Sequence, residues 1–462
     1  MAAAALVMVP ASVSGVGGRA GRGREMALHS DPRVLVVAAD DDLVGSLCAG
    51  LDQLGWRTVT ARSLDAALAT LADIRFDAAI IDARRCELAS DVERLRSAAE
   101  PRYLAILGLG GTEGADVRGP DLVMSTAPHP AQVALRLDQL TRAAIAEEEF
   151  RLRQATFAAY GVDLPSPVDD GSPLQVLTAG PADRRFLGLA NALTAGGAEV
   201  VAAPTPYTAF DYLHERAFDA AVLWGGPDHA PALSIASGMK RNTRLYHIPL
   251  TLYLRDPADA RLPELYARGF ADVAAADTPE VETAERVLAL ARNHRQRQSI
   301  RRALDAVRSS DLVEAATGLF TRQLFAAHLA RLADGARSRE RPLSVCVLRV
   351  AETDAITRAR AGGWLERALP QIGAMISRLV RVEDTAARLS DEVFVLVLPA
   401  TAEDAARAAA ERIAAVIACT AFDAGHDRSP FVVEFDVGVA EMADAETPAA
   451  VLERASADLN RV

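Results

Sequence analysis

The sequence predicts an α/β protein with two doubly wound parallel sheets, followed by a third α/β domain of a different kind. Along the first two thirds of the 462 residues, short apolar runs alternate with amphipathic stretches, a pattern typical of βαβ units. The segment FDAAII at 76–81 recurs as FDAAVL at 218–223, an offset of 142 residues (218 minus 76). The same offset carries the apolar run at 34–37 onto 176–179. Two copies of one parallel-sheet domain are therefore expected.

Composition excludes several classes of protein. The chain has 50 Lys+Arg against 62 Asp+Glu, a formal charge of −12, whereas a general nucleic-acid binder needs clustered cations. No apolar run approaches the ~18–20 residues of a membrane helix. The four cysteines are far apart and form no C-x-x-C pair, so neither a zinc site nor a disulfide framework is indicated. We expect a cytoplasmic protein without nucleic-acid binding or membrane insertion.

The predicted boundaries follow changes in composition. The Ala-rich and Gly/Arg-rich start is expected to be a flexible tail, with Met26 as an alternative start, and a Pro/Asp/Gly/Ser stretch ends the first linker. Six arginines between 292 and 308 predict a solvated connecting helix. The expected parts are a tail at 1–31, a first sheet domain at 32–146, a linker helix and loop at 147–173, a second sheet domain at 174–293, a connecting helix at 294–310 and a last domain at 311–462.

Residues at the strand ends of the two copies allow a comparison with one family. Asp82 ends the third expected strand of the first copy, and both copies resemble the receiver domain of response regulators, a flavodoxin-like fold. In that family an acidic pair holds Mg²⁺ beside an aspartate that is phosphorylated, and a lysine neutralises the phosphoryl group. The resemblance makes Asp82 the candidate phosphoacceptor of this chain.

Other receiver positions depart from the family pattern. Ala38 and Ala39 align with the acidic pair, and Ala127 aligns with the lysine. Asp40, Asp41 and Asp42 follow directly and either substitute in part or, as we favour, begin the next helix. Trp224 stands at the acceptor position of the second copy, and tryptophan cannot be phosphorylated. Both copies are expected to be degenerate receivers that serve docking or dimerisation.

Four motifs of the last third occur in the order and spacing of another family. They are TGLFTRQLF at 317–325, RLSDEVFVLVLP at 388–399, FDVGV at 435–439 and the helix at 448–459. This set resembles a GGDEF domain, the catalytic domain of diguanylate cyclases. Active members join two GTP molecules into cyclic di-GMP, with two carboxylate-held metal ions that neutralise the triphosphates.

The positions that this chemistry requires are altered. The strand position of one metal carboxylate aligns with Arg349, and the Asn that reads guanine aligns with Thr321. The signature glycines are replaced, and the substituting side chains crowd the approach of a nucleotide. The signature reads Ser390, Asp391, Glu392, Val393 and Phe394 in place of G-G-D-E-F. We expect no cyclase activity, no catalytic residue and no metal site.

One ligand motif of the family is intact. Diguanylate cyclases bind cyclic di-GMP at an inhibitory R-x-x-D site, and Arg381 and Asp384 stand at the family's spacing before Ser390. Arg412 matches a further ligand arginine. A guanidinium and a carboxylate suit phosphate and the guanine edge. The alternative is a surface ion pair between residues i and i+3.

Taken together, the architecture resembles the PopA-like cyclic di-GMP effectors, which are degenerate receiver–receiver–GGDEF response regulators. The resemblance implies a homodimeric adaptor that binds cyclic di-GMP as an intercalated dimer and localises to a cell pole.

 It also implies recruitment of an RcdA-like partner and a CtrA-like client to a ClpXP-type protease. Two alternatives stay open: a residual diguanylate cyclase that uses Glu392, and a phosphorylation-driven scaffold that acts through Asp82 without a nucleotide.

Overall fold

The computed structural model describes most of the chain after residue 31. The described residues are 32–39, 41–84, 87–110, 119–124, 128–167, 171–181, 183–225, 229–242, 244–254, 262–275, 277–308, 310–425 and 429–459, and the side chains of 41–43 are not among them. The predicted tail at 1–31, Asp40 and Ala127 therefore lie outside the described residues, as do the side chains of Asp41 and Asp42. The described residues all belong to one compact unit.

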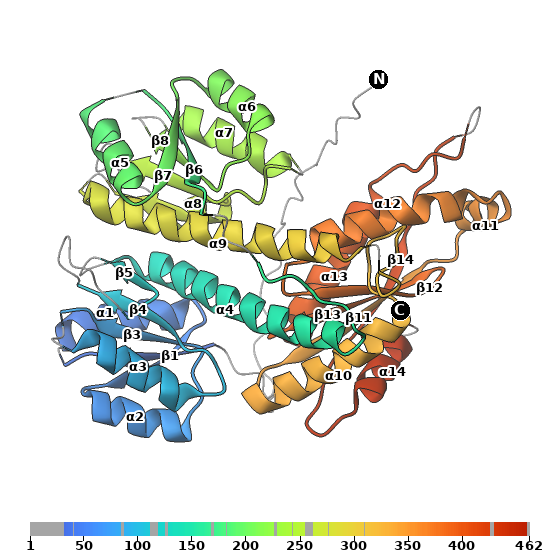
Figure 1. Cartoon of the computed structure of the whole chain (residues 1–462), viewed down its shortest axis with the longest axis horizontal. Coiled ribbons are helices and arrows are strands. Elements are labelled where there is room, and N and C mark those ends of the chain that lie inside the picture. The colour runs from blue at the N-terminus through green and yellow to red at the C-terminus, as the bar shows by residue number, and fades with distance from the viewer. Residues whose placement is uncertain are drawn as a thin grey trace, which may run out of the picture. The chain divides into compact units, whose positions relative to one another are not determined.

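The first sheet is parallel and has the strand order β2-β1-β3-β4-β5, the flavodoxin-like order (Figure 1). Apolar strand residues are buried on both faces, which is typical of a parallel sheet between helices. Its strands are β1 (Arg33–Val37), β2 (Arg57–Ala61), β3 (Ala78–Asp82), β4 (Ala105–Leu109) and β5 (Leu122–Met124). Its helices are α1 (Asp41–Gln53), α2 (Leu64–Asp73), α3 (Leu88–Ala99) and α4 (Pro130–Ala158).

The second sheet repeats this design with the order β7-β6-β8-β9-β10, again parallel. The prediction of two doubly wound sheets is confirmed. The strands are β6 (Leu174–Ala179), β7 (Ala198–Ala203), β8 (Ala220–Gly225), β9 (Leu250–Leu254) and β10 (Asp272–Ala274). The helices are α5 (Arg184–Ala195), α6 (Pro206–Glu215), α7 (Ala230–Arg241), α8 (Leu262–Ala267) and α9 (Glu280–Ala306).

The repeated FDAA segment has the same structural role in both sheets. The carboxylate of Asp77 accepts a hydrogen bond of 3.0 Å from the main-chain amide of Arg33, at the start of β1. The carboxylate of Asp219 accepts one of 2.8 Å from the amide of Gln175 in β6. Each aspartate thereby satisfies an amide at the beginning of the neighbouring strand, which explains why this polar residue interrupts an apolar run.

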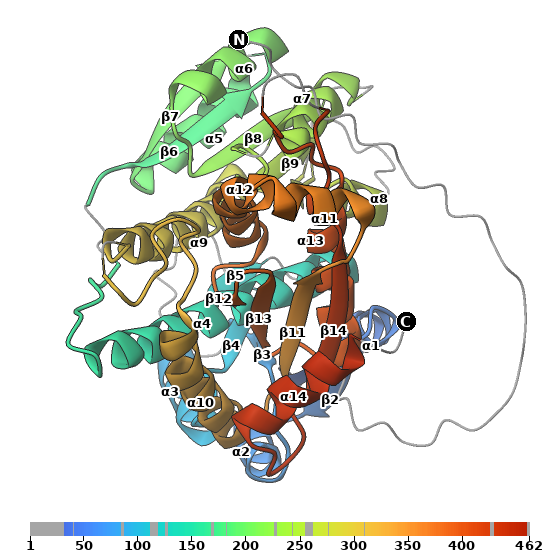
Figure 2. The same ribbon diagram turned by 90° about the vertical axis from the view of Figure 1, so that its right-hand side faces the viewer.

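The last third forms a four-stranded antiparallel sheet with the order β12-β13-β11-β14. Alternate residues of β11 face opposite sides, so Cys346 and Leu348 pack with α12 and α13, whereas Val345 and Val347 pack with α10 and α14 (Figure 2). The strands are β11 (Leu343–Val350), β12 (Thr385–Ser390), β13 (Val393–Pro399) and β14 (Phe435–Glu441). The helices are α10 (Arg322–Arg339), α11 (Asp354–Ala361), α12 (Trp364–Leu379), α13 (Glu403–Ala418) and α14 (Pro448–Asp458).

Two long helices connect these sheets. α4 has 29 residues and α9 has 27, and they run side by side, with the Gln296 amide donating to Glu147 at 2.6 Å (Figure 1). A buried ion pair of 2.6 Å between Arg136 of α4 and Asp272 of β10 fixes α4 to the second sheet. Arg286 of α9 contacts the same Asp272 carboxylate at 2.8 Å. Each helix continues past the end that we predict for its sheet domain, and the domain boundaries themselves stay predictions.

Among the helices of the described part of the chain, none combines the length and the apolar character needed to cross a bilayer.

Candidate ligand-binding site

The R-x-x-D segment forms a tight turn between α12 and β12. The carboxylate oxygen Oδ2 of Asp384 accepts a hydrogen bond of 2.9 Å from the main-chain amide of Arg381, and the Asp384 amide donates to the Arg381 carbonyl at 3.2 Å. Val382, Glu383 and Asp384 are buried, whereas Arg381 is half-buried. The alternative of a surface ion pair is therefore not what the described residues form, because the Asp384 carboxylate binds the main chain and not the Arg381 guanidinium.

Asp384 is unusual for a carboxylate. Asp384 is only 8% exposed, and its carboxylate oxygen Oδ1 has no hydrogen-bond partner among the described residues. Burial, followed by the charge of Glu383, raises the pKa of Asp384 to about 6. The carboxylate keeps one unused acceptor oxygen and changes its charge close to neutral pH.

Arginines from two other helices surround this turn. Arg142 of α4 and Arg297 of α9 interact electrostatically with Arg381 and with the buried Glu383. Arg142 is exposed, yet desolvation and the charge of Arg381 lower its pKa. Desolvation also lowers the pKa of Arg297 and of Arg301, one helical turn further along α9. Within the described residues, the guanidinium groups of Arg142, Arg297 and Arg381 make no hydrogen bond or ion pair within 4 Å.

The positive region extends towards Arg412, which is exposed on α13. Arg412 and Arg301 both interact electrostatically with Tyr246, whose hydroxyl donates to the Arg378 carbonyl at 3.1 Å. The ring of Tyr246 lies 3.6 Å from that of His247, and Arg301 contacts His247 Nε2 at 3.2 Å. Burial and the neighbouring arginines lower the pKa of His247 to about 3, so this imidazole is neutral at pH 7 and adds no competing charge.

The predicted solvated helix at 294–310 is therefore only partly solvated. Arg302 is exposed, but Arg297 and Arg301 face the R-x-x-D turn from one side of α9. Arg295 instead pairs with Asp219 at 2.5 Å and donates to the Pro173 carbonyl at 2.8 Å. Sequence reasoning noted the arginine run but did not identify which arginines turn inwards, and Arg142 carries no local signal at all.

The altered GGDEF signature lies at the β12–β13 hairpin. The two carboxylate oxygens of Glu392 each accept a 2.7 Å hydrogen bond from Arg360, which also contacts Glu352 at 2.8 Å. Ser390 and Val393 are paired at the end of the hairpin, and the side chain of Asp391 is almost fully exposed beside Arg388. The signature carboxylate is thus engaged with an arginine.

Arg349 and Thr321 occupy the two other altered positions. Arg349 lies next to the hairpin, because the following residue, Val350, donates its amide to the Glu392 carbonyl at 3.0 Å. Its guanidinium is 3.0 Å from a carboxylate oxygen of Asp436 in β14. Thr321 is separate from this group: its hydroxyl caps the N-terminus of α10 by accepting from the Leu324 amide.

Asp82, the candidate phosphoacceptor, is the last residue of β3. Arg84 holds both of its carboxylate oxygens, with hydrogen bonds of 2.8 and 2.7 Å from Nε and Nη2. The corresponding position of the second sheet holds Trp224, which is buried, with its ring 5.4 Å from Phe186 and 5.5 Å from Tyr253.

The last third of the chain matches a known protein family. Residues 312–462 match the family model described as diguanylate cyclase, GGDEF domain. This part of the chain is a GGDEF domain. The GGDEF family assignment agrees with the resemblance seen in the four sequence motifs.

A curated relative extends the similarity beyond the GGDEF domain. The response regulator PleD of Caulobacter vibrioides (strain NA1000 / CB15N) is 25% identical over 225 residues, which are 48% of this chain and 49% of PleD. PleD of strain ATCC 19089 / CIP 103742 / CB 15 matches to the same extent. The chain thus spans about half the length of the curated relatives it matches.

Solved structures include further GGDEF domains. The GGDEF domain of DgcB from Caulobacter crescentus, in complex with c-di-GMP, is 20% identical with a TM-score of 0.30, covering 32% of this chain and 86% of that one. The FimX GGDEF domain from Pseudomonas aeruginosa is 17% identical with a TM-score of 0.30, covering 33% of this chain and 93% of that one.

Proposed function

We propose that this chain is a catalytically inactive GGDEF-family effector that binds cyclic di-GMP at Arg381, Asp384 and Arg412. In this proposal Arg142, Arg297 and Arg301 complete the ligand site. The ligand bridges the GGDEF domain to the two long helices α4 and α9, and so fixes their arrangement.

One observation carries this proposal: guanidinium groups from α4, α9 and the R-x-x-D turn converge, and among the described residues none of them forms an ion pair within 4 Å. The carboxylates of Glu383 and Asp138 act on them only at longer range. Keeping such cations together and partly desolvated is costly unless an anion binds there. Cyclic di-GMP supplies two phosphates and two guanine bases, and guanidinium groups form bidentate hydrogen bonds with both. Asp384 adds an acceptor for the guanine N–H groups.

The inactive status rests on the contacts of the altered positions. The diguanylate cyclase reaction implies two metal ions held by carboxylates, and these residues do not fit such ions. Arg349 is a cation paired with Asp436, and Arg360 already neutralises Glu392. No catalytic step is therefore assigned to this chain.

The receiver-like sheets are proposed to act as docking surfaces of a PopA-like adaptor. Arg84 neutralises Asp82, and Trp224 fills the second acceptor position, which supports docking in preference to phosphotransfer. The recruitment of RcdA-like and CtrA-like partners to a ClpXP-type protease, the homodimer and the location at a cell pole belong to this proposal.

Calorimetric titration of cyclic di-GMP into the full chain tests the binding. Arg381→Ala should weaken binding by about 10–100-fold, because a charge-assisted hydrogen bond contributes roughly 1.5–3 kcal/mol. Arg302→Ala, an exposed arginine on α9, is the matched control and should bind like the wild type. A wild-type chain that does not bind cyclic di-GMP, or that forms it from GTP with Mg²⁺ or Mn²⁺, would contradict the proposal.

A further inference from the structure

Helix α4 reaches the R-x-x-D turn through one buried arginine. Nη1 of Arg153 donates to the Val382 carbonyl at 2.9 Å, and Nη2 donates to the Asp384 carbonyl at 2.8 Å. The same Nη2 also contacts the Thr385 hydroxyl at 3.2 Å. One guanidinium therefore holds two main-chain carbonyls of the turn, from the side opposite to solvent, since Arg153 is 2% exposed.

A buried polar network fixes the orientation of Arg153. Glu149, one helical turn earlier on α4, accepts from Arg153 Nε at 3.0 Å and from the Thr385 hydroxyl at 3.2 Å. His328 of α10 places Nε2 2.8 Å from the same carboxylate, and its Nδ1 lies 3.0 Å from the Thr156 hydroxyl of α4. Although burial opposes ionisation, the charges of His328 and Arg153 lower the pKa of Glu149. The carboxylate stays ionised and keeps the guanidinium in place.

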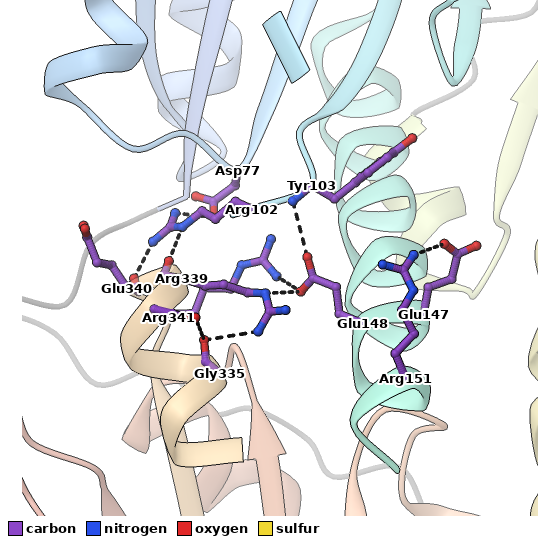
Figure 3. A network of polar contacts seen from close by, with 11 residues as sticks. Asp77, Arg102, Tyr103, Glu147, Glu148, Arg151, Gly335, Arg339, Glu340 and Arg341 are labelled. Carbon is purple, nitrogen blue, oxygen red and sulfur yellow. Dashed lines mark hydrogen bonds and ion pairs between the residues drawn. The ribbon is translucent and has the colours of Figure 1, made fainter. Parts of the chain in front are cut away.

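Glu148, the residue before Glu149 on α4, links this helix to the first sheet domain as well. Glu148 accepts from the main-chain amide of Tyr103 at 3.3 Å and pairs with Arg341 at 2.5 Å and Arg339 at 3.4 Å (Figure 3). Arg102, next to Tyr103, donates to the carbonyls of Arg339 and Glu340 at the end of α10. The adjacent residues Glu148 and Glu149 thus contact the loop before β4, α10 and Thr385, which directly follows the R-x-x-D turn.

We propose that Arg153 is a positioning residue that sets the shape of the 381–384 turn and couples the ligand affinity of that turn to the position of α4. This inference rests on the proposed function, because it concerns the same cyclic di-GMP site. Arg153 does not touch the ligand; it acts through the carbonyls of Val382 and Asp384. By linkage, ligand binding strengthens the attachment of α4 as much as that attachment strengthens binding.

The arrangement requires arginine in particular. A planar guanidinium reaches two carbonyls and a carboxylate at once, whereas a lysine ammonium retains the charge but lacks this fork. Arg153→Lys therefore separates positioning from charge. Arg151, two residues earlier, has a largely exposed side chain and faces Glu147 at 3.6 Å, so Arg151→Lys is the matched control.

The test measures cyclic di-GMP affinity and local hydrogen exchange on the full chain. Arg153→Lys should weaken binding by about tenfold or more, and the amides of 381–385 should exchange faster while those of β13 stay unchanged. Glu149→Gln, which removes the charge that orients Arg153, should shift both readouts in the same direction. Arg151→Lys should change neither.

A double-mutant cycle distinguishes positioning from general destabilisation. If Arg153 acts through the turn, Arg153→Lys should cost little further affinity once Arg381 is replaced by alanine, whereas independent effects would add. A wild-type chain that binds while Arg153→Lys binds equally tightly would overturn this inference and leave the proposed function intact. A wild-type chain that does not bind at all would overturn both.

Discussion

Arg349 and Asp436 face each other across neighbouring strands, and their side chains form an ion pair of 3.0 Å. In the diguanylate cyclases that this domain resembles, a metal-binding carboxylate stands at the position of Arg349. The pair places a protein guanidinium at this end of β11.

Restoring one carboxylate should not restore catalysis. We expect Arg349→Asp to form no cyclic di-GMP from GTP, because Glu392 remains bound by Arg360 and the new carboxylate faces Asp436. The lost ion pair is about two fifths exposed and should contribute less than ~1 kcal/mol to stability. Chromatography of the nucleotide products and a urea unfolding curve measure the two effects. Product formation by this single variant would contradict the inactive status.

The buried carboxylate of Asp384 should make stability depend on pH. Its pKa is raised from 3.8 to about 6 in the folded chain, so the folded state binds the extra proton between these values. Stability contributed by the protonated form is therefore present at low pH and is lost as the pH rises through 6. Asp384→Asn should raise the free energy of unfolding by about 2–3 kcal/mol at pH 8 and by little near pH 4. Urea unfolding at both values checks this, with the exposed Asp391→Asn as a control that should show no such difference.

The only lysine of the chain offers a probe of the ligand site. Burial lowers the pKa of Lys240 from 10.5 to about 8, and this side chain interacts electrostatically with His247 and His294 near Arg301. A bound dianion should stabilise the charged amine and raise its pKa. Reductive methylation with carbon-13 formaldehyde should give one lysine signal that titrates near 8 and shifts to higher pH with cyclic di-GMP. Lys240→Arg should remove the signal, and a titration unaffected by ligand would place the ligand elsewhere.

The contact between β14 and α14 should tolerate no added side chain. A Cβ on Gly438 would lie 2.1 Å from the Ala455 carbonyl oxygen and 2.9 Å from the Leu459 nitrogen, both of them main-chain atoms. Gly438→Ala should destabilise the chain by about 1–3 kcal/mol or more. Gly45, inside α1, has open space around its Cβ position, so Gly45→Ala should stabilise by about 0.5–1 kcal/mol. Thermal unfolding of both variants provides the comparison, and equal shifts would contradict it.

The sheets were predictable because each is encoded locally. The pairing of Val34 with Ala78 recurs as the pairing of Val176 with Ala220, which is the offset visible in the sequence. Strand ends were equally accessible, as Asp82 shows. These features depend on the alternation of apolar runs and helices, which a single sequence retains.

The surroundings of the ligand turn were not predictable in the same way. Arg142 and Arg297 lie near Arg381 only because two long helices run side by side to the third sheet, and no local pattern specifies that arrangement. The burial of Asp384 was missed for a related reason: the spacing of R-x-x-D does not reveal what covers the turn. Arg153 binds main-chain carbonyls. Because every residue has a main-chain carbonyl, the residue types in the sequence do not reveal these contacts.

The buried ion pair between Arg136 and Asp272 anchors α4 to the second sheet near the start of this helix. Arg153 lies 17 residues further along the same unbroken helix, at a rise of about 1.5 Å per residue, or roughly 25 Å away. A tilt of α4 by about 5° around this anchor would displace Arg153 by roughly 2 Å. A displacement of that size is too large for the 2.9 Å hydrogen bond from Arg153 to the Val382 carbonyl to persist. A rotation of that size at the second sheet would release both carbonyls of the turn together, because a single guanidinium holds them.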